Sequence, residues 1–321
     1  MRVLDSGDVY RLLDMESCIR EVENAFRARG EGRRASSAVA GLELNGGALH
    51  AKLGALDLSR SYAAVKINAN FPDNPARFGL PTIQGIVVLF DASTGEPLAC
   101  MDSGPITALR TAAASAVAAR YLALRSASSV ALIGCGTQAR AHVIALRHVR
   151  PIERIVVFDA DRNTADRIAK ELAKDGKVSV SVADHLQQAT TGAEIVVTST
   201  PSRTAFLDVG SVSRGTFIAA VGADNEHKQE ITPALLRASA VVVDDLDQCS
   251  RIGDLHHAIE QGVMRREDIR ASLDQVVAGR VSGRLNETET IIFDSTGVAI
   301  EDVAAAAVVY ERAEPSPAAN S

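Results

Sequence analysis

The sequence lacks three features that would point to a metal, a nucleic acid or a membrane as the partner. Its 4 cysteines, Cys18, Cys100, Cys135 and Cys249, lie far apart and show none of the paired spacings of a zinc site or a redox motif. The 34 basic residues are outnumbered by 40 acidic ones, and the net charge of -6 argues against a nucleic-acid or anionic-membrane partner. No stretch approaches the roughly 18 consecutive apolar residues of a membrane span. We therefore expect no metal site, no nucleic-acid partner and no membrane partner.

The composition that remains is that of an ordinary globular protein. With 321 residues, of which 46% are hydrophobic and 23% charged, the chain predicts two domains that each bury a core. The charged segment after Met1 has no apolar run behind it, so we expect no secretory signal and a cytoplasmic location.

The second part of the chain, from Ser129 to about Ser295, alternates short β-branched runs with longer helical patterns. This alternation predicts an α/β fold, a doubly wound parallel sheet of the Rossmann type. The expected strands are Val130–Ile133, Ile155–Phe158, Val178–Val182, Ile195–Ser199, Phe217–Val221, Val241–Asp244 and Ile291–Phe293.

The first hundred residues predict a smaller, mostly antiparallel α+β module behind a helix at Met15–Arg29. A following Ala-rich helix is predicted over Thr107–Leu124, with Thr107 as its N-cap and Arg110 in its first turn. A last helix, Ile300–Arg312, is expected to return to the first module, so residues 1–110 and 299–321 form one domain and 111–298 the other. The strands expected in the first module are Ala38–Leu44, Ala48–Leu53, Ala63–Ile67, Gln84–Phe90 and Leu98–Met101.

A glycine turn follows the first strand of the second domain and carries the dinucleotide fingerprint. Gly134 permits a tight turn, Gly136 lets the backbone approach a pyrophosphate, and Ala139 is small enough for the helix to pack on the strand. Thr137 and Gln138 open the helix, whose N-terminus favours phosphate charge. The alternative is a glycine turn in an α/β domain that binds no nucleotide.

The choice of cofactor depends on the end of the next strand. Asp159 is placed to accept a hydrogen bond from a ribose 2′-hydroxyl, which favours NAD(H). Arg162 lies close enough in sequence to meet a 2′-phosphate, so NADP(H) stays open. Further cofactor contacts are expected where two other strands end, at Thr198, Ser199, Thr200 and Val221.

Segments along nearly the whole chain resemble the ornithine cyclodeaminase/mu-crystallin family, and most closely its Δ1-pyrroline-2-carboxylate/ketimine reductase members. The resemblance implies a homodimer whose first module binds the substrate and makes the subunit contact, and whose second module is a Rossmann domain. The segments that carry it are 101–111 (MDSGPITALRT), 133–138 (IGCGTQ), 221–224 (VGAD), 228–230 (KQE), 293–297 (FDSTG) and Glu301-Asp302.

The same resemblance implies roles for individual residues. Lys66 and Arg110 bind the substrate carboxylate, and Lys66 also takes part in catalysis; a cation suits this task, and arginine offers bidentate geometry. Arg34 is a further candidate, with Lys52 as its competitor. Asp224 faces the substrate nitrogen and handles its proton. Further family positions are Thr82 in the substrate pocket and Thr111, Ser295 and Gly297 against the cofactor.

Several chemistries share this framework. The preferred hypothesis is reduction of a small cyclic imino acid, Δ1-pyrroline-2-carboxylate or Δ1-piperideine-2-carboxylate, to L-proline or L-pipecolate. The alternatives are an ornithine cyclodeaminase that uses NAD catalytically, an alanine-dehydrogenase-type oxidoreductase, and a non-catalytic mu-crystallin-like binding protein. The segment Gly222–Lys228 departs from the Gly-Asp-Cys-Pro-Gly-Lys pattern of the cyclodeaminases, which weakens that alternative.

Overall fold

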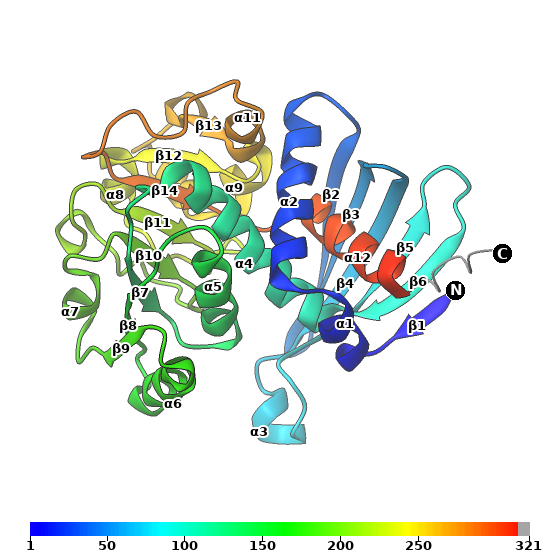
Figure 1. The fold of residues 1–321 in the computed structure, drawn as a ribbon, viewed down its shortest axis with the longest axis horizontal. Coiled ribbons are helices and arrows are strands. Elements are labelled where there is room, and N and C mark those ends of the chain that lie inside the picture. Colours follow the sequence, from blue (N-terminus) through cyan, green and yellow to red (C-terminus); the bar gives the residue numbers. More distant parts are fainter. Residues whose placement is uncertain (314–321) are drawn as a thin grey trace. The chain divides into compact units, whose positions relative to one another are not determined.

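The chain forms two units, of which one combines two separate segments of the sequence (Figure 1). The computed structural model describes residues 1–313. One unit consists of Met1–Arg110 with Val298–Ser321, and the other of Thr111–Gly297.

The smaller unit is built on a six-stranded sheet in the order β1-β6-β5-β4-β3-β2. Neighbouring strands from β2 to β6 run antiparallel, and the short β1, which the sequence did not predict, pairs parallel with β6. The strands are β1 (Arg2–Leu4), β2 (Ala35–Leu44), β3 (Gly47–Asp57), β4 (Ser61–Asn70), β5 (Ile83–Asp91) and β6 (Pro97–Asp102).

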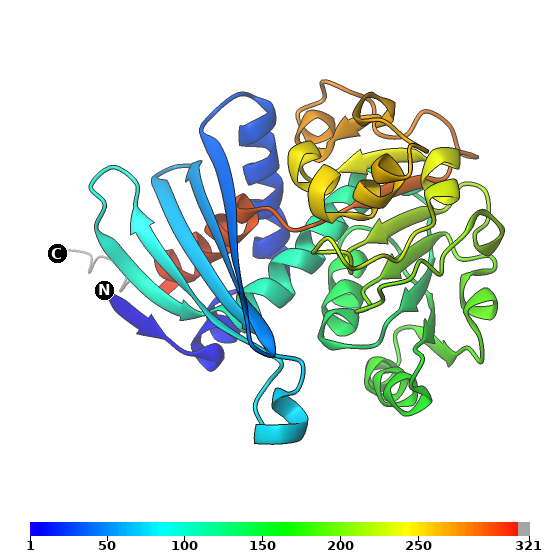
Figure 2. The same cartoon turned by 180° about the vertical axis from the view of Figure 1, so that it is seen from behind.

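Helices cover one face of this sheet. Both α2 and α12 lie on the face seen in Figure 1, and α12 packs so closely on β3 that a Cβ at Gly54 would lie 3.0 Å from Ala299. Figure 2 shows the opposite face, which no helix among residues 1–313 covers. The helices of this unit are α1 (Ser6–Leu12), α2 (Met15–Gly30), α3 (Asn74–Phe78) and α12 (Ala299–Ala313).

Strand alternation decides which side chains of β4 face the helices. Tyr62, Ala64 and Lys66 are buried, whereas Val65 is half-buried and Ile67 is exposed on the opposite face. A charged side chain therefore occupies a position in the covered face where an apolar residue would be expected.

The larger unit confirms the predicted Rossmann-type fold: eight parallel strands in the order β13-β12-β14-β11-β10-β7-β8-β9. The last strand in sequence, β14, is inserted between β11 and β12, which brings Asp294 to the middle of the sheet. The strands are β7 (Ser129–Ile133), β8 (Arg154–Phe158), β9 (Ser179–Val182), β10 (Ile195–Thr198), β11 (Phe217–Ala220), β12 (Ala240–Val243), β13 (Ala271–Ser272) and β14 (Ile291–Asp294).

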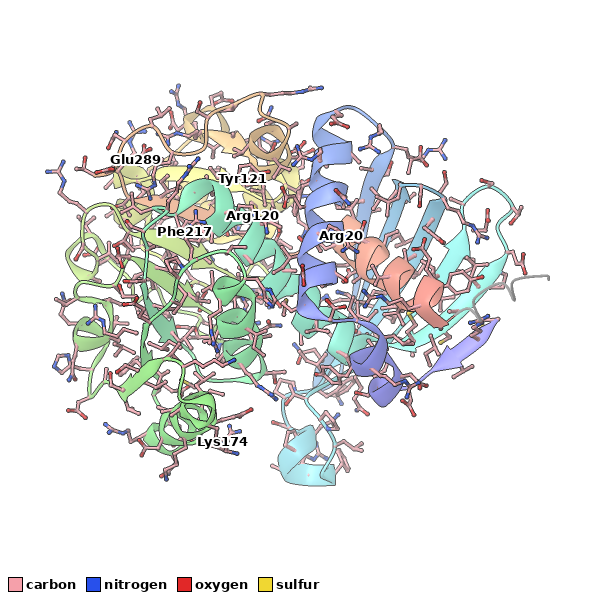
Figure 3. The ribbon with its side chains drawn as sticks, in the orientation of Figure 1. Arg20, Arg120, Tyr121, Lys174, Phe217 and Glu289 are labelled. Carbon is pink, nitrogen blue, oxygen red and sulfur yellow. The ribbon has the colours of Figure 1, made fainter. Side chains whose placement is uncertain are left out.

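The inner strands β7, β10, β11 and β14 are buried along their whole length, as expected of strands covered on both faces by helices. Phe217, which starts β11 and is labelled in Figure 3, is fully buried. Three 3₁₀ turns lie at Ala173–Asp175, Val209–Ser211 and Arg266–Asp268. The helices are α5 (Thr137–Arg147), α6 (Arg162–Leu172), α7 (Leu186–Thr190), α8 (Pro233–Ala238), α9 (Leu246–Ile252), α10 (Asp254–Glu260) and α11 (Leu273–Val277).

Helix α4 (Ser103–Leu122) starts earlier than predicted. Asp102 accepts a hydrogen bond from the backbone N–H of Gly104 at 2.8 Å and so caps the helix, and Pro105 is tolerated in a first turn. The predicted N-cap, Thr107, lies inside the helix with its hydroxyl buried and without a hydrogen-bond partner. Arg110 is therefore beyond the first turn, and the helix N-terminus does not help it to attract an anion.

None of the helices in residues 1–313 is both long enough and apolar enough to span a bilayer.

Candidate functional site

The turn after β7 has the geometry that its glycines predict. Gly134 has a φ of +94°, and a Cβ there would lie 2.8 Å from the carbonyl oxygen of Ser199. Its N–H donates to the carbonyl of Phe158 at 2.9 Å, which ties the turn to the end of β8. A residue with a side chain would strain this turn, because both the backbone conformation and the space exclude it.

The N-terminus of α5 is open. Gly136 is its N-cap, no side chain caps the helix, and a Cβ on Gly136 would meet nothing within 4 Å. Ala139 is buried against the sheet, Thr137 is exposed, and Oε1 of Gln138 is buried without a hydrogen-bond partner. Free space beside uncapped N–H groups suits a pyrophosphate.

Asp159 supports the glycine turn directly. Its Oδ2 accepts a hydrogen bond from the N–H of Cys135 at 2.7 Å, and its Oδ1 accepts one from the N–H of Asp161 at 2.9 Å. Each oxygen retains a lone pair for a ribose hydroxyl. Arg162 forms ion pairs with Asp166 and Asp184, so the cation named for a 2′-phosphate is already paired with two acids.

The predicted cofactor residues at the end of β10 use their hydroxyl groups to bond other parts of the protein. Thr198 and Thr200 both donate to Glu230 at 2.7 Å, and Ser199 donates to the carbonyl of Gly134 at 3.3 Å. The N–H of Val221 donates to the carbonyl of Thr198 at 3.0 Å. These side chains hold the loops at the carboxyl edge of the sheet together, which leaves backbone groups to meet a ligand.

Hydrogen bonds to Asp244 hold the loop after β14. Ser295 donates its hydroxyl to Asp244 at 3.2 Å, and the N–H of Gly297 donates to the same carboxylate at 2.6 Å. Gly297 has a φ of +76°, which requires glycine. Thr111 is half-buried on α4, directly after Arg110.

Asp224 is accessible in the turn that follows β11. Half of its side chain is exposed (51%), and Lys228 Nζ lies 2.7 Å from its Oδ1. The proposed proton-handling carboxylate therefore faces solvent and has one basic partner.

In the smaller unit, Lys66 is buried and paired. Its Nζ lies 2.8 Å from Oδ1 of Asp302, in the first turn of α12. The strand register places Lys52 of β3 directly opposite Lys66 on the same face of the sheet. Burial, followed by the charges of Arg110 and Lys52, lowers the pKa of Lys66 to about 7, although Asp302 opposes the change.

Arg110 contacts both acidic residues at the start of α12. Its Nη1 donates to Glu301 at 2.8 Å, and its Nε lies 2.9 Å from Oδ1 of Asp302. Burial acts to raise the pKa of Asp302, but the charges of Lys66 and Arg110 dominate and hold that pKa below its usual value. Oδ2 of Asp302 is buried and accepts no hydrogen bond.

The structure brings together Lys66, Arg110 and Lys52 but not the other two substrate-site candidates. Arg34 is exposed just before β2, at the end of the sheet where Asp57 donates its N–H to the Arg34 carbonyl at 3.0 Å. Thr82 precedes β5, and its carbonyl accepts a hydrogen bond from Phe71 at 2.8 Å. Of the two candidates for a third cation, Lys52 is the one placed beside Lys66.

Sequence reasoning missed the acids that organise these residues. Glu301 and Asp302 were noted only as part of a motif, and Glu230 and Asp244 received no role. The one available signal was the position of Asp244 directly after a strand and of Glu301 and Asp302 in the first turn of a helix, where carboxylates meet unpaired N–H groups. Glu230 lies in a loop and had no such signal.

A Rossmann-type sheet with an open glycine turn, joined to an antiparallel α+β unit that buries a cationic cluster, defines a two-unit dinucleotide-binding protein. The chain belongs to the ornithine cyclodeaminase/mu-crystallin family, whose sequence pattern matches residues 2–316, and this confirms the resemblance found in the sequence.

Curated relatives match between 78% and 98% of the chain. Alanine dehydrogenase of Archaeoglobus fulgidus is 38% identical over 97% of this chain and 94% of its own. Iminosuccinate reductase of Paracoccus denitrificans is 32% identical over 98% and 97%. Δ1-Pyrroline-2-carboxylate reductase of Bacillus cereus is 35% identical over 78% and 77%.

Solved structures show the same fold. An archaeal alanine dehydrogenase dimer with bound NAD has a TM-score of 0.92 and 38% identity, covering 98% of this chain and 96% of its own. The Thermococcus litoralis Δ1-pyrroline-2-carboxylate reductase in complex with NADH and L-proline also has a TM-score of 0.92, with 32% identity and coverages of 98% and 97%. A lysine cyclodeaminase has a TM-score of 0.85, with 32% identity over 98% and 92%.

Proposed function

We propose that this protein uses NAD(H) to reduce a small cyclic imino acid, Δ1-pyrroline-2-carboxylate or Δ1-piperideine-2-carboxylate, to L-proline or L-pipecolate. The observation that carries the proposal is the cluster of buried Lys66 and Arg110, with half-buried Lys52 opposite Lys66, around Glu301 and Asp302. Lys66 and Arg110 both contact Asp302, and the charge of Lys52 also acts on it. Cations grouped in this way would attract the single carboxylate of the substrate.

Arg110 and Lys66 divide the binding between them. Arg110 offers a fork of donors for a bidentate contact, and Lys66 offers a point charge. Both contact Oδ1 of Asp302. Substrate binding therefore has to share or displace this contact.

The cofactor residues fit NAD(H). Gly134, Gly136 and the N-terminus of α5 would hold the pyrophosphate, and Asp159 would accept a hydrogen bond from the adenosine ribose. The carboxylate of Asp159 would repel a 2′-phosphate, so NAD(H) is preferred over NADP(H). When bound, the dinucleotide supplies the hydride that adds to C2 of the imine.

Asp224 is the residue proposed to handle the proton. Reduction of the imine adds a proton to the ring nitrogen, and an adjacent carboxylate stabilises the positive charge that the nitrogen carries. Asp224 suits this role because it is exposed and keeps Oδ2 available while Lys228 contacts Oδ1.

A second candidate function is alanine-dehydrogenase-type oxidation of an amino acid. It is favoured by the 38% identity to the Archaeoglobus fulgidus enzyme. The same cluster and the same carboxylate would serve it, since hydride transfer at the α-carbon is common to both reactions. In this reaction water would hydrolyse the open-chain imine, whereas the substrate of the reductase is a cyclic imine.

Three assays on the purified protein separate these functions. NADH oxidation with Δ1-pyrroline-2-carboxylate supports the reductase, and NADH oxidation only with pyruvate and ammonium supports the dehydrogenase. Ammonia release from L-ornithine with no net change in NADH would make it a cyclodeaminase.

Two further outcomes would contradict the proposal. No turnover of any amino or imino acid by a protein that binds NADH would refute catalysis. Unchanged turnover in Asp224→Asn would remove Asp224 from the mechanism.

The uncovered face of the smaller sheet supports a homodimer. Leu53, Ile67 and Ile86 lie on this face with exposures of 42%, 39% and 43%, and Val65 and Val88 lie between them. A contiguous apolar sheet face is covered by a partner in most soluble proteins. A second copy of the chain is the proposed partner because the related archaeal alanine dehydrogenase is a dimer.

Light scattering on a sizing column tests the dimer. Ile67→Glu places a charge in the centre of the face, and we expect it to yield monomers. Val263→Glu changes a residue of similar exposure (37%) in the other unit and should leave the dimer intact. A wild-type monomer, or an unchanged Ile67→Glu dimer, would contradict the assignment.

A further inference from the structure

Four fully buried carboxylates lie at the carboxyl edge of the larger sheet: Glu230, Asp244, Asp254 and Asp294. Across residues 1–313, no lysine, arginine or histidine forms an ion pair with any of them. Burying a carboxylate without a cation is costly, so each must be stabilised by hydrogen bonds.

Glu230 collects its hydrogen bonds from two different loops. Its Oε2 accepts from the hydroxyl of Thr198 at 2.7 Å and from the N–H of Gly222 at 2.9 Å. Its Oε1 accepts from the N–H of Thr200 at 2.6 Å and from its hydroxyl at 2.7 Å. One carboxylate therefore joins the loop after β10 to the loop after β11.

Gly222 packs directly against the carboxyl group of Glu230. A Cβ on Gly222 would lie 2.4 Å from the carboxyl carbon of Glu230, so glycine is required at this position. Asp224, the proposed proton-handling residue, follows in the same turn and donates its N–H to the Gly222 carbonyl at 3.1 Å.

The remaining acids extend this frame across the sheet. Asp254 accepts hydrogen bonds from the N–H groups of Glu230 and Ile231 at 2.8 and 2.9 Å, and so fixes the backbone that carries Glu230. Asp294, at the end of β14, accepts from the N–H of Leu255 at 2.9 Å. The loops after β10, β11 and β14 are thus linked through buried carboxylates.

We propose that Glu230 is a positioning residue for the reaction: its carboxylate fixes the two loops that present backbone groups to the cofactor and that carry Asp224. The inference rests on the proposed function, because it assigns the loops to NAD(H) binding and to proton handling. Glu230 itself is fully buried, so we assign it no direct part in the reaction.

Glu230→Gln is the direct test, because it keeps the shape of the side chain and replaces one acceptor oxygen with a donor. The new NH₂ group must face either the N–H of Gly222 or the N–H of Thr200, so one loop loses its anchor. We expect the Kd for NADH, measured by fluorescence titration, to rise about tenfold. We expect kcat to fall while KM for the imino acid changes less than about twofold, because Lys66 and Arg110 are untouched.

The chain offers a matched control at the amino edge of the same sheet. Oε2 of Glu194 accepts four hydrogen bonds from the N–H and hydroxyl groups of Ser128 and Ser129, at the start of β7. Glu194→Gln removes a carboxylate charge from the same sheet but keeps its Oε position as the acceptor of all four bonds, so it should leave the NADH Kd unchanged. Equal NADH affinities for wild type and Glu230→Gln, or an equal loss in both variants, would overturn the proposal.

Hydrogen exchange on the ligand-free protein gives an independent readout. The amide of Thr200 or of Gly222 should exchange faster in Glu230→Gln, whereas neither of them should do so in Glu194→Gln. If Glu230→Gln does not fold, Thr200→Val removes one donor to the carboxylate and should give a smaller change of the same kind. A wild type that binds no NADH would refute the proposed function, whereas a wild type that binds NADH and an unaffected Glu230→Gln would refute only the role of Glu230.

Discussion

The smaller unit buries acidic side chains beside cations, and the larger unit buries them beside hydrogen-bond donors. Asp302 lies within 2.9 Å of both Lys66 and Arg110. Glu230 and Asp254 instead accept hydrogen bonds from backbone N–H and threonine hydroxyl groups. An ion pair can be exchanged for a ligand's charge, whereas a network of backbone hydrogen bonds holds its loops in one arrangement. The first arrangement suits substrate binding and the second suits a scaffold.

Replacing Lys66 removes one of the two cations that contact Asp302. Lys66→Met leaves Asp302 buried with one cation fewer, and we expect kcat/KM to fall more than about a hundredfold and stability to fall by about 3–5 kcal/mol. Lys66→Met combined with Asp302→Asn should recover stability but not activity, because the carboxylate site is still lost. Denaturant unfolding and steady-state kinetics measure the two effects.

Lys174→Met is the control for this pair of variants. Lys174 is exposed in the 3₁₀ turn after α6 and is labelled in Figure 3. If its kinetics change as much as those of Lys66→Met, the role of Lys66 would have to be withdrawn.

The pH dependence of substrate binding reports the charge of Lys66. The pKa of Lys66 is lowered to about 7, chiefly by burial, so the amine loses its charge as the pH rises through neutrality. We expect KM to rise about tenfold per pH unit above about pH 7, because a neutral amine binds a carboxylate weakly. Lys66→Arg keeps its charge at these pH values and should flatten the profile. A wild-type KM that is constant from pH 6 to 9 would contradict this assignment.

In the larger unit, the buried acids Asp254 and Asp294 have a smaller effect, on stability. Burial, and then the charges of Asp294 and Glu230, raises the pKa of Asp254 well above its usual value, and burial raises that of Asp294 to about 7. At these two carboxyl groups the folded protein therefore binds more protons than the unfolded chain above about pH 4, and their contribution to stability falls as the pH rises from there. Asp254→Asn keeps an acceptor for both N–H groups and removes this penalty.

Thermal unfolding at two pH values checks that expectation. At pH 8 we expect the Tm of Asp254→Asn to exceed that of the wild type by about 2–4 °C, and near pH 4 the two should agree. A variant that is less stable than the wild type at pH 8 would show that the charge of Asp254 stabilises the fold.

Local patterns in the sequence were sufficient to predict most of the fold. The β-branched runs gave every strand of the larger sheet except the short β13, and the glycine turn after β7 came directly from its fingerprint. The start of α4 was wrong because Asp102 competes with Thr107 as a cap, and the capping hydrogen bond to Gly104 is visible only in three dimensions. The insertion of β14 between two earlier strands is likewise a matter of long-range pairing, which strand propensity does not encode.

The candidate site was predictable as a set of residue types but not as a set of contacts. Lys66 and Arg110 were identified by resemblance, yet their pairing with Asp302 depends on α12 packing against β3 and β4. The choice between Arg34 and Lys52 depended on strand register, because only Lys52 lies opposite Lys66.

The position of β14 and α12 also governs when each unit can be completed during synthesis. The N-terminal part of a chain emerges from the ribosome first, but β11 and β12 lack the strand between them until residues Ile291–Asp294 have emerged. Lys66 likewise has to wait for Asp302 before its charge is paired in the core. Both units are therefore closed by the last part of the chain, so premature termination before Ile291 would leave neither of them able to fold.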